Sequence, residues 1–168
     1  MNQLQQAALY LRFDHVKKRT ANRDDPHGTL LAACSAQNPD PKTQIGVIRY
    51  LLKCGASINE TDKNGVTPLH RAVRFRSPAA VRELIARGAD VNAVDKKSAS
   101  TPLHRAVTNT GAPATSGKTD LAIEIAELLL ASGADPRIRN KNGKVPLDCV
   151  KNTAMKNVFD KYDARQLV

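Results

Sequence analysis

One seven-residue phrase occurs twice in this chain. TPLHRAV occupies residues 67–73 and again residues 101–107, a period of 34 residues. Each copy leads through an amphipathic stretch to a Gly-Ala-Asp, which begins at Gly88 and at Gly133. A repeat of this period predicts a solenoid, in which each unit packs only against its neighbours.

Residues 62–94 show what one repeat encodes. Thr67 can cap a helix whose first turn holds Pro68, because the N–H that proline lacks would have no partner there. Pro78 ends that helix and starts a second, and Gly88 ends the second. The apolar stripes at helical spacing are Leu69, Ala72 and Val73, then Val81, Leu84 and Ile85. Stacking should join these into the continuous rows Leu69, Leu103, Leu147 and Leu52, Ile85, Leu130.

These 33 residues resemble an ankyrin repeat almost position for position. A second match covers 95–139, and a third opens at residue 140 with Asp148 in place of the histidine. Residues 24–61 resemble a first repeat that has lost the proline and has Leu31 at the histidine position. The resemblance implies an all-α repeat solenoid of about four repeats, each a helix-turn-helix plus a β-hairpin or loop.

Capping helices are expected at both ends of the stack. Residues 1–23 should form the first cap, and residues 151–162 should complete the last repeat, 140–168, before a mobile tail at 163–168. The side chains expected to face the stack are Leu4, Ala8 and Leu11 at the first end and Met155, Val158 and Phe159 at the second.

Two repeats are longer than the regular one between their helices. The extra residues, 35–41 and 110–118, have loop composition, and we interpret them as surface insertions rather than binding loops. Residues 112–119 also satisfy a relaxed phosphate-loop pattern. That chemistry needs a preceding strand, a glycine-rich backbone and an acidic magnesium ligand, which this sequence does not offer. A nucleotide-binding enzyme is therefore a remote alternative.

The histidines and cysteines show no catalytic or metal-binding pattern. His70 and His104 lie in adjacent repeats, whose helices stack about 10 Å apart, too far to share a zinc ion bound at about 2.1 Å. The resemblance implies that each histidine makes a hydrogen bond to the backbone near a hairpin. The same resemblance implies that this histidine contact, or lock, is missing or changed in the first and last repeats. Cys34, Cys54 and Cys149 should be buried thiols. We expect no enzyme activity, no catalytic residue, no cofactor and no metal.

The chain is strongly basic, with 26 Lys and Arg against 16 Asp and Glu and a formal net charge of +10. The resemblance implies a concave binding face built from hairpin tips and the exposed side of the first helices. The matching positions are Lys63, Asn64, Val66, Arg71, Arg74, Phe75, Lys96, Lys97, Arg105, Thr108, Asn109, Lys141, Asn142 and Lys144. If Arg71 and Arg105 are exposed, replacing both should leave stability nearly unchanged.

A basic face of this kind complements an acidic protein segment, so we predict a protein–protein interaction scaffold. Nucleic acid is the alternative ligand, although three Phe and three Tyr are too few and too scattered for a stacking platform. Neither a membrane span nor a secretory signal is expected. We expect a cytoplasmic monomer, with the nucleus or delivery into a host cell as alternatives; residues 17–19 fit a helix end better than a nuclear address.

Overall fold

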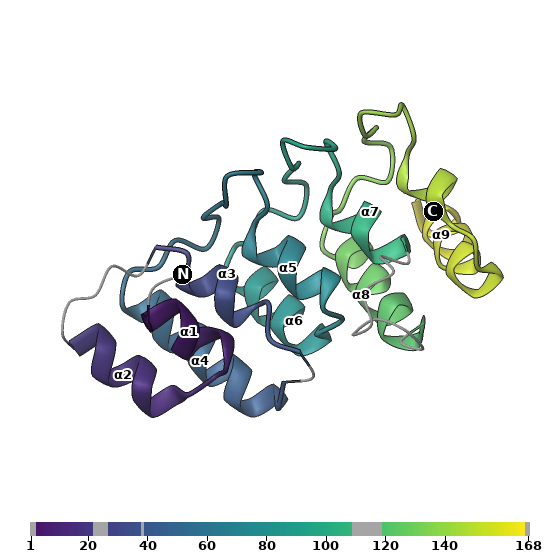
Figure 1. Ribbon diagram of the computed structural model, residues 1–168. Coiled ribbons are helices and arrows are strands. Elements are labelled where there is room, and N and C mark those ends of the chain that lie inside the picture. Colours follow the sequence, from purple (N-terminus) through teal and green to yellow (C-terminus); the bar gives the residue numbers. More distant parts are fainter. Residues whose placement is uncertain (1–2, 22–26, 38, 109–118, 167–168) are drawn as a thin grey trace.

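The computed structural model describes residues 3–21, 27–37, 39–108 and 119–166. In it, pairs of helices pack one after another along a single stack (Figure 1). The stack begins with α1 (Gln3–Leu9) and α2 (Phe13–Ala21) and ends with α9 (Thr153–Gln166). The loops that join one repeat to the next project on one side, at the top of Figure 1. Within the described ranges there are helices and no strands. The predicted all-α repeat solenoid is confirmed.

Two rows of helices run along the stack. The inner row contains α3 (Thr29–Ala33), α5 (Pro68–Arg74), α7 (Pro102–Val107) and the 3-10 helix η2 (Pro146–Cys149). The outer row contains α4 (Pro41–Lys53), α6 (Pro78–Ala86), α8 (Thr119–Ala131) and α9. Because α1 packs on α3 and α2 packs on α4, the first two helices continue both rows and cover their end.

A threonine and a histidine begin the inner helix of the two regular repeats. Thr67 Oγ1 accepts a hydrogen bond from the His70 backbone N–H at 3.3 Å, and the imidazole Nδ1 accepts one from the Thr67 N–H at 3.3 Å. Thr101 and His104 repeat this arrangement at the start of α7. The TPLH sequence therefore forms a reciprocal cap, which satisfies N–H groups that a helix start leaves unpaired.

The first and last repeats replace the histidine with carboxylates. Buried Glu60, which follows the first repeat's helices, accepts hydrogen bonds from the backbone N–H groups of Gly28 and Leu31, both at 2.9 Å. At the other end, Asp148 accepts one from the Val145 N–H at 2.9 Å. The lock predicted to be missing or changed at both ends is therefore changed at each, and a negative charge at a helix start is favourable.

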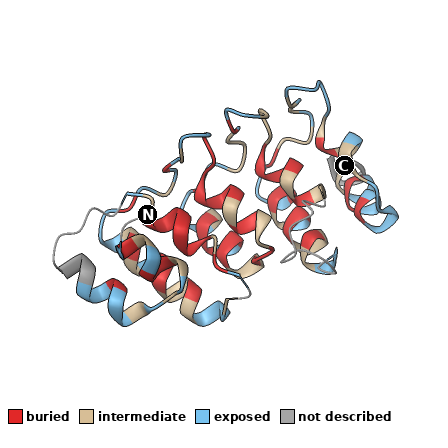
Figure 2. Cartoon of the chain, viewed as in Figure 1, coloured by how far each residue is buried: buried red, intermediate tan, exposed pale blue. Residues whose placement is uncertain are grey.

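The core is a continuous apolar cluster between the two rows of helices (Figure 2). In the inner row Leu69 and Leu103 are buried as predicted, whereas Leu147 is only half-buried. In each of the outer helices α4, α6 and α8 one leucine is completely buried: Leu51, Leu84 and Leu129. Leu52 and Ile85, which were predicted to face the core, are only half-buried. Leu130, the third member of that predicted row, is buried as expected. The prediction is therefore off by one position at Leu52 and Ile85 alone, since adjacent apolar residues fit the helical period almost equally well.

The expected first cap is divided into two helices. Leu4 and Ala8 are buried in α1 as predicted, but Leu11 has a left-handed backbone with φ 52° and lies between α1 and α2. At the far end, the side chains of Met155, Val158 and Phe159 are buried as predicted. Helix α9 continues to Gln166, so the expected mobile tail is helical over 163–166 and otherwise lies outside the described residues.

The three cysteines are free thiols in different surroundings. Cys34 is buried, Cys149 is half-buried and Cys54 is exposed. Burial, together with the negative charge of Glu60, raises the pKa of Cys34. The expectation of three buried thiols is wrong for Cys54, because this residue follows the end of α4 at the surface.

The phosphate-loop-like segment falls almost entirely on residues 109–118, outside the described ranges. Residue 38 of the first insertion is outside them as well. None of the described helices combines the length and the apolar character that a membrane span needs.

Candidate functional site

A hollow of about 580 Å³ opens where the hairpin tips meet the inner helices. Its lining, which we call the basic hollow, is Asp62, Asn64, Val66, Arg71, Arg74, Asp95, Lys97, Ser98, Arg105, Lys141 and Asn142. Eight of the fourteen positions predicted for the binding face are among these residues. The structure therefore brings most of that face together across three successive repeats.

Hydrogen bonds between neighbouring hairpin tips hold the rim of the basic hollow. The Lys96 backbone N–H donates to the Asn64 carbonyl at 2.8 Å, and the Lys141 N–H donates to the Ser98 carbonyl at 2.9 Å. The Lys141 ammonium also donates to the Lys96 carbonyl at 2.6 Å. Each tip is thus tied to the next, which fixes the positions of the side chains that surround the opening.

Two arginines in the basic hollow are paired within their own repeats. Arg71 Nη2 lies 2.7 Å from Asp62 Oδ2, and Arg105 Nη2 lies 3.1 Å from Asp95 Oδ2. The Arg71 and Arg105 side chains are 30% and 19% exposed. Neither arginine meets the condition of exposure on which the expected neutral effect of replacing both depended. We now expect a loss of stability, because removing either leaves a partly buried carboxylate without its cation.

Local hydrogen bonds keep these two carboxylates ionised. Burial acts to raise the pKa of Asp62, but the N–H groups of Val66 and Asn64, followed by Arg71, outweigh it and lower that pKa. Burial likewise opposes ionisation of Asp95, and hydrogen bonds from Ser98 together with the Arg105 charge lower its pKa. Both aspartates therefore carry a charge at neutral pH and hold their arginines in place.

Arg74 differs from the other two arginines. It is half-buried, and no hydrogen bond or ion pair joins its guanidinium to any described residue. The Nε atoms of Arg71, Arg74 and Arg105 are all buried without a described acceptor. The lining of the basic hollow carries five cations, Arg71, Arg74, Lys97, Arg105 and Lys141, against two carboxylates, Asp62 and Asp95. The hollow is therefore basic, with donors that lack acceptors.

The remaining predicted positions lie outside the basic hollow. Lys63, Lys96 and Lys144 are exposed on the hairpin tips, Phe75 is half-buried at the end of α5, and Asn109 is outside the described residues.

Two of the predicted positions have little surface or hydrogen-bonding capacity to offer a partner. Val66 lines the hollow but is only 8% exposed. The Thr108 hydroxyl donates to the His104 carbonyl at 3.0 Å, so its hydrogen is already used in a bond to the backbone of α7.

His70 and His104 connect each repeat to the next. His70 Nε2 lies 2.9 Å from the Ser100 carbonyl, and His104 Nε2 lies 3.0 Å from the Lys144 carbonyl. Burial lowers the pKa of His70 to about 4 and also lowers that of His104, so both are neutral structural groups at pH 7. Among the described residues, no three His, Cys, Asp or Glu side chains are grouped to hold a metal.

Sequence reasoning missed Arg76, which is buried with φ 56°. Its guanidinium donates to the carbonyls of Val73 at 3.3 Å, Arg105 at 3.2 Å and Thr108 at 2.9 Å, and thus joins the ends of α5 and α7. Nothing in the sequence separates this arginine from its solvated neighbours, since its partners are backbone groups.

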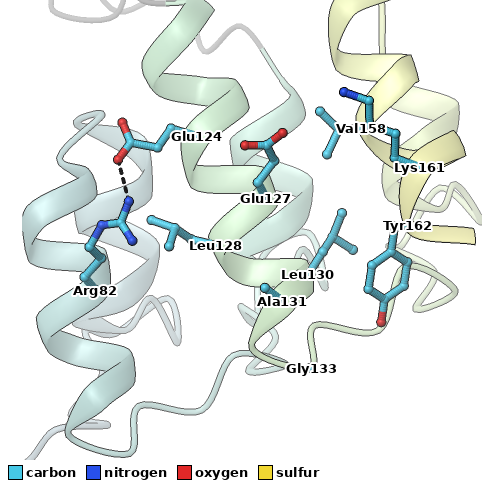
Figure 3. A pocket seen from close by; sticks show the side chains of 10 residues that line it. All are labelled: Arg82, Glu124, Glu127, Leu128, Leu130, Ala131, Gly133, Val158, Lys161 and Tyr162. Atoms are coloured by element: carbon cyan, nitrogen blue, oxygen red, sulfur yellow. Dashed lines mark hydrogen bonds and ion pairs between the residues drawn. The ribbon is translucent and has the colours of Figure 1, made fainter. Parts of the chain in front are cut away.

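A second hollow of about 610 Å³ lies on the outer helices α6, α8 and α9 (Figure 3). Arg82 and Lys161 face Glu124 and Glu127 there, and an ion pair joins Arg82 to Glu124 at 2.9 Å. None of these residues was predicted as part of a site. Because its charges balance, this hollow does not share the character of the basic one.

Comparison with known proteins gives one family and several longer relatives. A family model described as ankyrin repeats (3 copies) matches residues 4–95 and 31–140. BRCA1-associated RING domain protein 1 of Caenorhabditis elegans is 28% identical over 151 residues, which cover 89% of this chain and 20% of that protein. A putative ankyrin repeat protein of Fowlpox virus is 37% identical over 108 residues, which cover 63% of this chain and 28% of the viral protein. Tyrosine-protein kinase Shark of Drosophila melanogaster is 29% identical over 135 residues, covering 72% and 13%. The chain thus spans a minor part of the length of each.

Proposed function

Because this chain belongs to the ankyrin-repeat family, we propose that it is a non-catalytic module that binds an acidic protein segment through the basic hollow. Ankyrin repeats generally mediate protein–protein interaction. The observation that supports an acidic partner is the charge of the basic hollow, which three repeats share. Its lining has five cations and only two carboxylates. Complementary charge would both attract such a partner and set its register.

A protein partner suits the basic hollow better than nucleic acid does. Its described lining contains no aromatic side chain on which a base could stack. Asp62 and Asp95 would also repel a continuous phosphate backbone, whereas an acidic peptide can place its charges between them. We further propose a cytoplasmic monomeric scaffold, since free thiols suit a reducing compartment.

Charge reversal at the exposed lysines of the hollow tests this function. We would compare the wild-type chain with the double variant Lys97→Glu/Lys141→Glu in pull-downs from native cytosol. The control, Lys53→Glu/Lys156→Glu, makes the same change in net charge at exposed positions on α4 and α9. The wild type and the control should retain a partner that the first variant loses, through repulsion as well as lost attraction.

The same experiment separates the two classes of ligand. Retention of the partner should weaken as salt rises but persist after nuclease treatment and in excess duplex DNA. If the first variant retains the partner as well as the control does, binding through this hollow is refuted. Loss of the captured material on nuclease treatment would favour the nucleic-acid alternative.

A further inference from the structure

The five cations of the basic hollow are not equally available to a ligand. Asp62 holds Arg71, and Asp95 holds Arg105. The Lys141 ammonium donates to the Lys96 carbonyl at 2.6 Å. This leaves Arg74 and exposed Lys97 as the lining cations that make no hydrogen bond or ion pair with any described residue.

Of these two cations, Arg74 is the better placed to fix a ligand. It lies one turn after Arg71 on α5, so the two side chains share one face of that helix. Arg74 is half-buried, and its Nε is buried without a described acceptor. A guanidinium offers several N–H donors in a planar fork that matches the oxygens of a carboxylate. Partial burial strengthens that attraction by limiting screening by water.

The arrangement occurs only once among the described repeats. The position equivalent to Arg74 in the next repeat is Thr108, whose hydroxyl is already bonded to the His104 carbonyl. The paired arginine, in contrast, recurs as Arg71 and Arg105. Among the three arginines that line the hollow, Arg74 is therefore the one without a carboxylate partner among the described residues, whereas Arg71 and Arg105 are each paired.

We infer that Arg74 is the anchor for a single oxyanion carried by an extended acidic segment of the partner. This inference rests on the proposed function and adds where the partner's key charge binds. Arg74 would donate to the oxyanion from its N–H fork, in the same hollow that the Asp62–Arg71 and Asp95–Arg105 pairs line. An extended chain advances about 3.3 Å per residue, so about three residues would span one repeat, and the charge opposite Arg74 would set the register.

The test uses hexaglutamate as the probe, with hexaglutamine as the uncharged comparison. In the isotope-labelled full chain, the Nε–H resonance of Arg74 should shift on adding hexaglutamate and stay in place on adding hexaglutamine. Arg74→Gln should weaken hexaglutamate binding about tenfold, and Arg74→Lys should weaken it less. Arg82→Gln is the control, because it removes an equal charge from α6 on the outer row.

A hexapeptide with one central phosphoserine among glutamines distinguishes the source of the oxyanion. Tighter binding of this peptide than of hexaglutamate, lost in Arg74→Gln, supports the anchor with a phosphate as its ligand; tighter binding of hexaglutamate supports it with a carboxylate. Equal affinity of wild-type chain and Arg74→Gln for both peptides, with urea midpoints showing that the variant is folded, would overturn the inference.

Failure of this inference can be told apart from failure of the proposed function. If Arg74→Gln keeps both the peptides and the captured partner while Lys97→Glu/Lys141→Glu loses the partner, only the anchor is wrong. If neither variant loses the partner, the function assigned to the hollow is wrong as well.

Discussion

Acid should weaken this fold through His70, an uncharged imidazole inside the stack. A carbonyl can only accept a hydrogen bond, so Nε2, 2.9 Å from the Ser100 oxygen, carries the hydrogen, and Nδ1 accepts from the Thr67 N–H. A second proton would place Nδ1–H against that donor and leave a buried charge. Burial lowers the pKa of His70 to about 4; the Ser100 bond opposes this and the Arg105 charge adds to it.

The sign and the size of the effect follow from that pKa. A histidine whose pKa is lower in the folded state than in the unfolded state makes its full contribution to stability when the pH is above the unfolded-state pKa. This contribution is lost as the pH falls toward the folded-state pKa. With pKa values of 6.5 unfolded and about 4 folded, His70 alone should lower the free energy of unfolding by about 2 kcal/mol between about pH 7.5 and about pH 5, and His104, whose pKa is also lowered, should add a loss of the same sign. Near pH 4 the loss should reach about 3 kcal/mol.

Urea unfolding across this pH range, on wild type, His70→Gln and His15→Gln, measures the effect. His70→Gln should be less stable near neutral pH, since it loses the imidazole bond to Ser100, but should lose about 2 kcal/mol less on acidification. His15 is exposed, so its variant should follow the wild type. An equally steep acid response in His70→Gln, or a His70 pKa near 6.5 by nuclear magnetic resonance titration, would refute the reasoning.

Four further substitutions test other features. Both Gly65 and Gly88 have positive φ, 73° and 84°, but a Cβ at Gly65 would lie 2.9 Å from the Lys96 nitrogen, whereas one at Gly88 would have no heavy atom within 4 Å. Gly65→Ala should therefore cost about 2 kcal/mol and Gly88→Ala about 1 kcal/mol in urea unfolding; equal losses would contradict this. Arg76→Lys should cost about 2 kcal/mol, since one ammonium cannot replace the guanidinium fork, and a loss below about 0.5 kcal/mol would argue against that role. Lys118→Ala should leave calorimetric titrations with magnesium-ATP unchanged, with no binding by either protein; micromolar affinity lost in the variant would revive the phosphate-loop hypothesis.

The fold could be predicted because local and long-range signals coincide in the repeated phrase. Thr67, Pro68 and His70 specify a helix start, and the same histidine makes the contact with the next repeat. The period then places equivalent leucines in rows. Within the outer helices the prediction was less accurate, since Leu51 and Leu52 are both apolar and only packing decides which of them is fully buried.

The charges of the site could be located from the sequence but not paired. Arg71 and Arg105 look like exposed cations because their aspartates come 9 and 10 residues earlier, before a turn that brings each pair together. The loss of the histidine at Leu31 was visible as well. Its replacement by Glu60, 29 residues later, depends on the folded path of the chain. Arg74 differs from Arg71 and Arg105 because it lacks a carboxylate partner among the described residues, and the sequence does not show this difference.

The contacts that His70 and His104 make with the next repeat end on carbonyl oxygens of the main chain, at Ser100 and at Lys144. Every amino acid supplies that oxygen, so the histidine makes no demand on the side chain it meets. Substitutions at residues 100 and 144 can therefore leave the bonds from His70 and His104 in place. The side chains at these two positions could be changed to suit another partner without removing the histidine contacts that join the repeats.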